Sequence, residues 1–136
     1  MLANRVIPVL LKRGDSLVKG ERFNSWRSVG HVLQAAKIHA SRQVDELIVL
    51  DISATPEGRG PDFEAIKELT YDCFCPITIG GGVRTIDDAK ALLRAGADKV
   101  AVHSGGQSLV KQIAERCGRQ AVVAVIDYYD NWVAIP

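Results

Sequence analysis

The chain has 136 residues, which suits one domain over residues 1–136. Its 17 basic and 16 acidic residues nearly balance, so the composition argues against a nucleic-acid partner. No apolar stretch approaches the roughly 20 residues that span a membrane. The N-terminus also lacks the apolar core and cleavage site of a signal peptide. We therefore expect a cytoplasmic protein with no membrane association.

Three cysteines, Cys73, Cys75 and Cys117, occur in the sequence. An odd number without a signal peptide argues against a disulfide framework. Cys73 and Cys75 are only two positions apart, which is poor spacing for a structural zinc site. We expect buried, unreactive thiols, no metal and no cofactor.

Apolar runs alternate with segments of helical period along the chain. The predicted strands cover residues 6–11, 46–51, 76–79, 99–102 and 121–126, and the predicted helices cover residues 31–42, 62–73, 85–95 and 108–117. The third helix has Thr85 as its N-cap, Asp88 as the partner in a capping box, and Gly96 after its end. The strands are continuously apolar, which is typical of a parallel sheet covered on both faces. The order predicts an α/β fold.

Two architectures fit this order, an open doubly wound sheet and a (β/α)8 TIM barrel. Polar residues or glycines follow each predicted strand, where a barrel builds its active site at the C-terminal face. A barrel needs roughly 250 residues. We therefore expect the N-terminal half of a barrel, with about five parallel strands and four helices. The missing strands would come from a C-terminal part or from a partner chain, and exposed sheet edges favour self-association.

A run of three glycines, Gly80–Gly82, follows the third predicted strand. Such a turn allows the backbone amides of Gly81 and Gly82 to bind a phosphate beside the next helix N-terminus. The alternative is a tight strand-to-helix turn. His103 and Ser104 follow the fourth strand and would share that phosphate, although His103 also fits a partly buried structural histidine.

Three further side chains are candidates for chemistry at the same face. Lys19 lies in a long loop after the first strand, where it would supply a cation to a phosphate or to a developing negative charge. Asp127 and Asp51 end their strands and suit a general acid or base, with Asp127 preferred. The alternatives are a solvated lysine and structural carboxylates.

Arg5, Glu46 and Lys99 each begin a predicted strand and therefore face the opposite, N-terminal end of the barrel. That end usually contributes stability rather than catalysis. Two cations and one anion there would form either a salt-bridge cluster that closes the barrel floor or a gate.

The motifs "RVIPVLL", "LVKG", "DELIVLDI", "GGGVRT", "LLRAGADKV" and "AVVAVID" resemble the cyclase subunit of imidazole glycerol phosphate synthase, a histidine-biosynthesis barrel family. The resemblance implies a lyase- or synthase-type barrel that accepts ammonia from a glutaminase subunit at its N-terminal face. The ammonia passes a charged gate and reacts at the C-terminal face with a phosphorylated ribulosyl substrate.

The same resemblance implies a role for each candidate residue. Arg5, Glu46 and Lys99 fall on the gate, and Lys19 falls on the mobile loop of the active site. The phosphate-binding and catalytic positions fall on Gly82, His103, Ser104 and Asp127.

The sequence departs from this family at the end of the first strand, where Leu11 replaces a second catalytic aspartate. His103-Ser104 also stands where the family usually has Asn-Thr. A leucine transfers no proton, and general acid–base catalysis is worth about 10²- to 10⁴-fold. The pattern is similar to a branch associated with glycosyl amidation in lipopolysaccharide O-antigen synthesis. The alternatives are a genuine histidine-pathway cyclase and a non-catalytic scaffold that activates a glutaminase; this chain alone is expected to be inactive.

Overall fold

A computed structural model of the chain describes residues 3–103, 106–129 and 132–134. Strands and helices alternate through most of it. In chain order the elements are β1 (Val9–Arg13), β2 (Ser16–Glu21), β3 (Asn24–His31), α1 (Val32–Ser41), β4 (Leu47–Asp51), α2 (Phe63–Asp72), β5 (Ile77–Gly80), α3 (Ile86–Arg94), β6 (Lys99–His103), α4 (Gln107–Cys117), a 3₁₀ turn (Arg119–Ala121), β7 (Val122–Val125), β8 (Asp127–Tyr129) and β9 (Trp132–Ala134).

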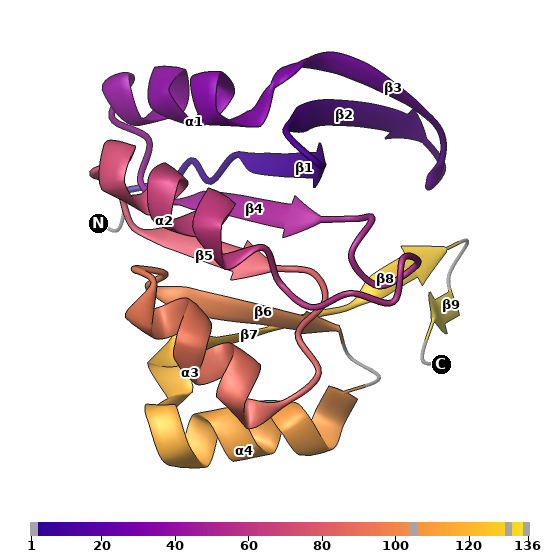
Figure 1. Ribbon diagram of the computed structural model, residues 1–136, viewed down its shortest axis with the longest axis vertical. Coiled ribbons are helices and arrows are strands. Elements are labelled where there is room, and N and C mark those ends of the chain that lie inside the picture. Colours follow the sequence, from indigo (N-terminus) through magenta and orange to yellow (C-terminus); the bar gives the residue numbers. More distant parts are fainter. Residues whose placement is uncertain (1–2, 104–105, 130–131, 135–136) are drawn as a thin grey trace.

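Seven strands form one sheet in the order β3-β2-β1-β4-β5-β6-β7. From β1 to β7 through β4, β5 and β6, neighbouring strands run parallel, whereas β2 and β3 are antiparallel additions at one edge. The four helices lie on one side of the sheet, and the β8–β9 hairpin lies beyond the C-terminal ends of the parallel strands (Figure 1). The predicted five parallel strands and four helices are confirmed.

The segment after β1, which the sequence led us to expect as a loop, forms the β2–β3 hairpin instead. Almost every residue of β3 is exposed, so the strand carries no apolar stripe that would reveal it. Arg22, Phe23 and Ser25 adopt positive φ values at or next to the turn, which is unusual for residues other than glycine. Lys19 therefore lies in a strand, β2, and not in a loop.

The main apolar core lies between the helices and the helix-facing side of the sheet. Its fully buried members include Leu47, Ile77, Leu92 and Ile113. The capping box at the start of α3 is confirmed. Thr85 Oγ1 accepts from the Asp88 amide at 3.1 Å, and Asp88 Oδ2 accepts from the Thr85 amide at 2.9 Å. This cap fixes where α3 begins, and therefore where the preceding loop must pass the sheet edge.

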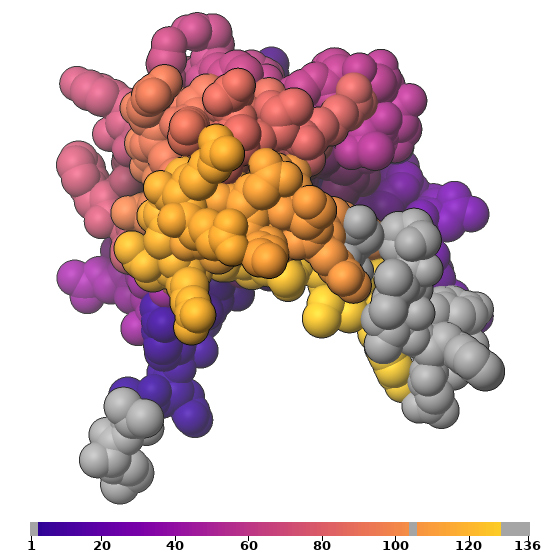
Figure 2. Space-filling model, turned by 90° about the horizontal axis from the view of Figure 1, so that it is seen from below, coloured from indigo at the N-terminus to yellow at the C-terminus, as the bar shows by residue number. Residues whose placement is uncertain are grey.

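The other side of the sheet carries none of the four helices and is called the open face here (Figure 1). In β1 the helix-facing Leu10 and Lys12 are buried, whereas Val9 and Leu11 alternate with them and are more exposed. Seen from below, the N-terminal segment projects away from the helices, and the surface beside it is hollowed (Figure 2). The open face is therefore concave, as in the wall of a barrel.

Among the described residues, no helix combines the length and apolar character needed to cross a membrane.

Candidate functional site

Arg5, Glu46 and Lys99 meet at the N-terminal edge of the sheet, and we call them the N-terminal charge cluster. Lys99 Nζ lies 2.8 Å from Glu46 Oε1 and 2.9 Å from Oε2, and the Arg5 guanidinium also donates to Oε1. Hydrogen bonds from Lys99 and Arg5 outweigh the cost of burial and lower the pKa of Glu46. The structure thus brings together the three residues that the sequence assigned to this end.

Above this cluster, the strand register aligns side chains in rows across the open face. One row contains Val9, Ile48, Thr78 and Lys99. The next row toward the C-terminal edge contains Leu11, Leu50, Gly80, Ala101 and Val123. Every member of the second row is apolar, and Leu11 belongs to it. The position to which the resemblance assigned a second catalytic aspartate is therefore part of an apolar layer.

His103 and Asp127 come together at the C-terminal edge of the open face. His103 ends β6, pairs with Val125 of β7, and places its Nε2 atom 3.0 Å from Asp127 Oδ2. Both side chains stay accessible, with exposed fractions of 44% and 41%. Ser104, the predicted neighbour of His103 in phosphate binding, lies outside the described residues.

Gly81 and Gly82 follow β5 with φ angles of +106° and +72°. A Cβ on Gly81 would lie 2.3 Å from the carbonyl oxygen of Asp51, and one on Gly82 would lie 2.9 Å from that of Arg59. Glycine is therefore needed at both positions because the backbone packs against the β4–α2 loop. This packing accounts for the glycines as a tight turn, and their phosphate-binding role stays a prediction.

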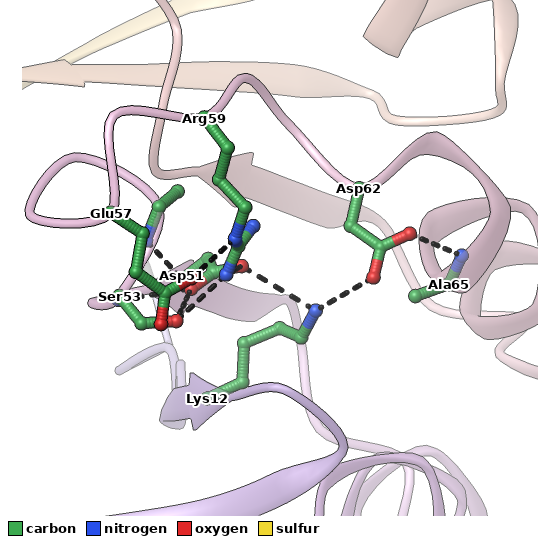
Figure 3. Close-up of polar contacts among 8 residues, drawn as sticks. Lys12, Asp51, Ser53, Glu57, Arg59, Asp62 and Ala65 are labelled. Carbon is green, nitrogen blue, oxygen red and sulfur yellow. Dashed lines mark hydrogen bonds and ion pairs between the residues drawn. The ribbon is translucent and has the colours of Figure 1, made fainter.

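Asp51 lies at the C-terminal end of β4, where it organises the start of the β4–α2 loop (Figure 3). Its Oδ1 atom accepts from the Ser53 amide at 3.0 Å, from Ser53 Oγ at 2.9 Å and from the Ala54 amide at 3.2 Å. Arg59 Nη2 lies 2.9 Å from Oδ2. Burial raises the pKa of Asp51, but the bonds from Ser53 and Arg59 outweigh it and lower the pKa overall. This arrangement suits a structural carboxylate, and its catalytic role stays a prediction.

Lys12 is a buried member of the same network, although the sequence-based prediction placed it after the strand rather than within it. Its side chain points to the helix side of the sheet, with Nζ 3.6 Å from both Asp51 Oδ2 and Asp62 Oδ2 (Figure 3). Asp62 in turn caps α2 through Oδ1, which accepts from the Ala65 amide at 3.2 Å. A lysine directly after an apolar run was the only signal for this position, because its partners are distant in sequence.

The remaining candidates lie outside these groups. Lys19 is exposed on β2, and the structure places it in the hairpin with Arg27 as its pairing partner.

Burial raises the pKa of Cys73 to about 11, which leaves its thiol protonated and unreactive at neutral pH. In the described part of the chain, no group of three or more His, Cys, Asp or Glu side chains forms a metal site.

The chain is similar to known proteins of one family. Residues 5–136 match the family described as "Histidine biosynthesis protein". Over 130 residues the chain is 40% identical to a Campylobacter jejuni protein named "Putative imidazole glycerol phosphate synthase subunit hisF2", covering 93% of this chain and 52% of that relative. The chain thus spans about half the length of the curated relative it matches. With its parallel sheet and one-sided helix layer, the chain belongs to the histidine biosynthesis protein family of TIM barrels.

Proposed function

We propose that this chain forms part of a cyclase-like barrel subunit that receives ammonia from a glutaminase and delivers it to a phosphorylated or sugar acceptor. The acceptor reaction we favour is sugar amidation in O-antigen or lipopolysaccharide synthesis. The observation that carries the proposal is the order of side chains along the open face. A charged cluster stands at the N-terminal edge, and an apolar layer that includes Leu11 follows it.

This order suits the passage of neutral ammonia rather than ammonium. Glu46 holds Lys99 and Arg5 across the N-terminal edge, so a molecule entering there must pass three paired charges. Beyond them, Leu11, Leu50 and Val123 offer no partner for an ion, and desolvating an unpaired charge is costly. In the middle of this row, a Cβ added to Gly80 would lie 2.8 Å from both Leu50 Cδ2 and Ala101 Cβ, so apolar side chains pack closely around Gly80.

The glutaminase would dock at the N-terminal edge, where α2 also ends. Phe74 and Tyr71 have exposed fractions of 97% and 83% at this end of α2. Exposed aromatic side chains are characteristic anchors of protein interfaces. They lie one short connection before β5, whose first residue, Ile77, starts at the same edge as the charge cluster.

The proposal is tested with the full gene product that contains this segment, mixed with its glutaminase subunit. Glutamine hydrolysis and consumption of the ribulosyl aminoimidazole carboxamide nucleotide are measured side by side. We expect stimulated glutamine hydrolysis without nucleotide consumption. Glu46→Gln, which removes the anion of the cluster, should reduce the stimulation at least several-fold, whereas Lys111→Met on the exposed side of α4 should not.

A genuine histidine-pathway cyclase is the second candidate, because the Campylobacter relative carries a synthase subunit name. It predicts nucleotide consumption at ordinary enzymatic rates in the same assay, and that result would overturn the sugar-amidation proposal. A subunit that stimulates glutamine hydrolysis but transfers nitrogen to no acceptor would instead be a non-catalytic scaffold.

A further inference from the structure

We propose that His103 is a positioning residue for Asp127 rather than a phosphate ligand. In this assignment, the imidazole holds one carboxylate oxygen while the other takes up the proton that ammonia releases as it attacks the acceptor. The inference rests on the proposed function, since it assumes that nitrogen transfer takes place at the C-terminal edge. It replaces the phosphate-binding role that the sequence suggested for His103. It also gives Asp127 a partner on β6, whereas the related family has a second aspartate on the first strand.

The geometry of the pair supports a fixed orientation. Nε2 of His103 lies 3.0 Å from Asp127 Oδ2, which is within hydrogen-bond distance. Because a carboxylate only accepts hydrogen bonds, the proposal places the proton of this contact on Nε2 of His103. Strand pairing also fixes the backbone of both residues. His103 pairs with Val125 in the main sheet, and Asp127 pairs with Ala134 in the β8–β9 hairpin.

Phosphate binding fits the same atoms less well. The Nε2 donor of His103 is already engaged by the Asp127 carboxylate. A phosphate dianion placed against this nitrogen would lie next to a second negative charge, and like charges at such short range repel strongly. The Asn of the related family would not meet this conflict in the same way, because its amide ends one bond closer to the backbone.

The proposed step balances for a carbonyl acceptor. The nitrogen lone pair forms the new C–N bond, and the π electrons of the C=O bond move to the oxygen. The nitrogen then loses one proton to Oδ1 of Asp127. On a ketone or aldehyde, the same proton passes to the acceptor oxygen and gives a carbinolamine. On an activated sugar carboxyl group, the C=O bond re-forms and the proton leaves with the displaced group. His103 stays bonded to Oδ2 throughout and neither gains nor loses a proton. Both side chains are about two-fifths exposed, so an acceptor arriving from solvent can reach them.

The pair itself is tested by NMR on the full gene product labelled with ¹⁵N-histidine. We expect two-bond couplings that identify a proton on Nε2 of His103, and imidazole signals that shift in Asp127→Ala but not in Asp87→Ala, an exposed carboxylate of α3. Addition of inorganic phosphate should leave these signals unchanged. A phosphate-induced shift that persists in Asp127→Ala, or a proton on Nδ1 alone, would overturn the assignment.

Under the second candidate function, in which the protein consumes the ribulosyl nucleotide, kinetics with ammonium chloride as the nitrogen source separate positioning from substrate binding. A glutamine amide reaches about as far as Nε2, whereas an asparagine amide does not. His103→Asn should therefore lower kcat about tenfold or more with little change in KM, and His103→Gln should recover most of it. A rise in KM alone in both variants would return His103 to phosphate binding. If the unmodified protein consumes no nucleotide, the cyclase candidate fails, and the NMR result alone decides on His103.

Discussion

Leu11 and Asp127 show how a single substitution changes what the open face can do. Leu11 stands in the apolar row beside Leu50, while Asp127 begins β8, just after the edge strand β7, with His103 as its partner. One carboxylate at the C-terminal edge can serve a single proton transfer. A ring closure that needs both an acid and a base would lack the second group on β1. The difference between the two candidate functions therefore depends on position 11.

Restoring a carboxylate at this position tests that dependence. Leu11→Asp in the full gene product should raise nucleotide consumption with ammonium by about 10²-fold or more, since it supplies the second proton-transferring group. The half-buried position on the open face tolerates a side chain of similar size. Leu11→Asn is the matched control, because it has the same shape and transfers no proton. Equal rates for the two variants would mean that the missing acid is not what limits cyclisation.

Asp51 makes a prediction about pH, because its pKa is lower in the folded protein than its ordinary value of 3.8. A carboxyl group with a depressed pKa contributes stability above the unfolded pKa and loses it as the pH falls through the folded pKa. The free energy of unfolding should therefore fall as the pH drops below about 3.8. Urea denaturation over a pH series measures this fall.

The matched variants are Asp51→Asn and, as a surface control, Asp87→Asn. Asp51→Asn should lower the free energy of unfolding by about 3 kcal/mol at neutral pH, because it leaves the buried Lys12 with only the more exposed Asp62 as its partner. It should also flatten the fall of the unfolding free energy in acid. Asp87→Asn, which removes only an exposed charge from the first turn of α3, should change both quantities far less. If the unfolding free energy of Asp51→Asn falls in acid as steeply as that of the unmodified protein, Asp51 is not the cause of this pH dependence.

At the level of elements, the sequence predicted the features that depend on local pattern. The four helices lie within a residue of their predicted bounds, because their apolar period, N-caps and terminal glycines are all local signals. The β2–β3 hairpin was missed because β3 exposes nearly all of its side chains. The Asp51 network was missed because Lys12, Arg59 and Asp62 approach it from separate parts of the chain.

The turn after β5 depends on contact between two elements and not only on its own glycines. Gly82 has φ +72° and lies against the β4–α2 loop, whereas Gly58 has φ +69° and a Cβ added there would meet nothing within 4 Å. Both Ala variants carry the same backbone strain of about 1 kcal/mol. Gly82→Ala adds a steric clash, so it should lower the free energy of unfolding by at least about 1 kcal/mol more than Gly58→Ala. If urea denaturation gives equal losses of unfolding free energy for the two variants, the β4–α2 loop moves aside with no energetic penalty.

At the scale of the whole molecule, the two edges of the sheet are chemically different. The N-terminal edge carries paired charges and exposed aromatic side chains, and the C-terminal edge carries His103, Asp127 and the glycine turn. The helices cover one side and leave the open face between these edges uncovered (Figure 1). A route from one edge to the other along the open face is consistent with a subunit that takes in a small molecule at one end and uses it at the other.

If a glutaminase docks at the N-terminal edge, the exposed end of α2 should contribute to its binding. Phe74→Ser in the full gene product should weaken binding about tenfold or more, because a central aromatic anchor is commonly worth over 1 kcal/mol. Phe23→Ser, which removes an exposed aromatic side chain at the β2–β3 turn, is the matched control and should change affinity little. Isothermal titration calorimetry with the glutaminase subunit measures both.

Because Phe74 is 97% exposed, its replacement should leave the unfolding transition unchanged, so a loss of affinity would report on the interface itself. Unchanged affinity for Phe74→Ser would move the docking surface away from α2.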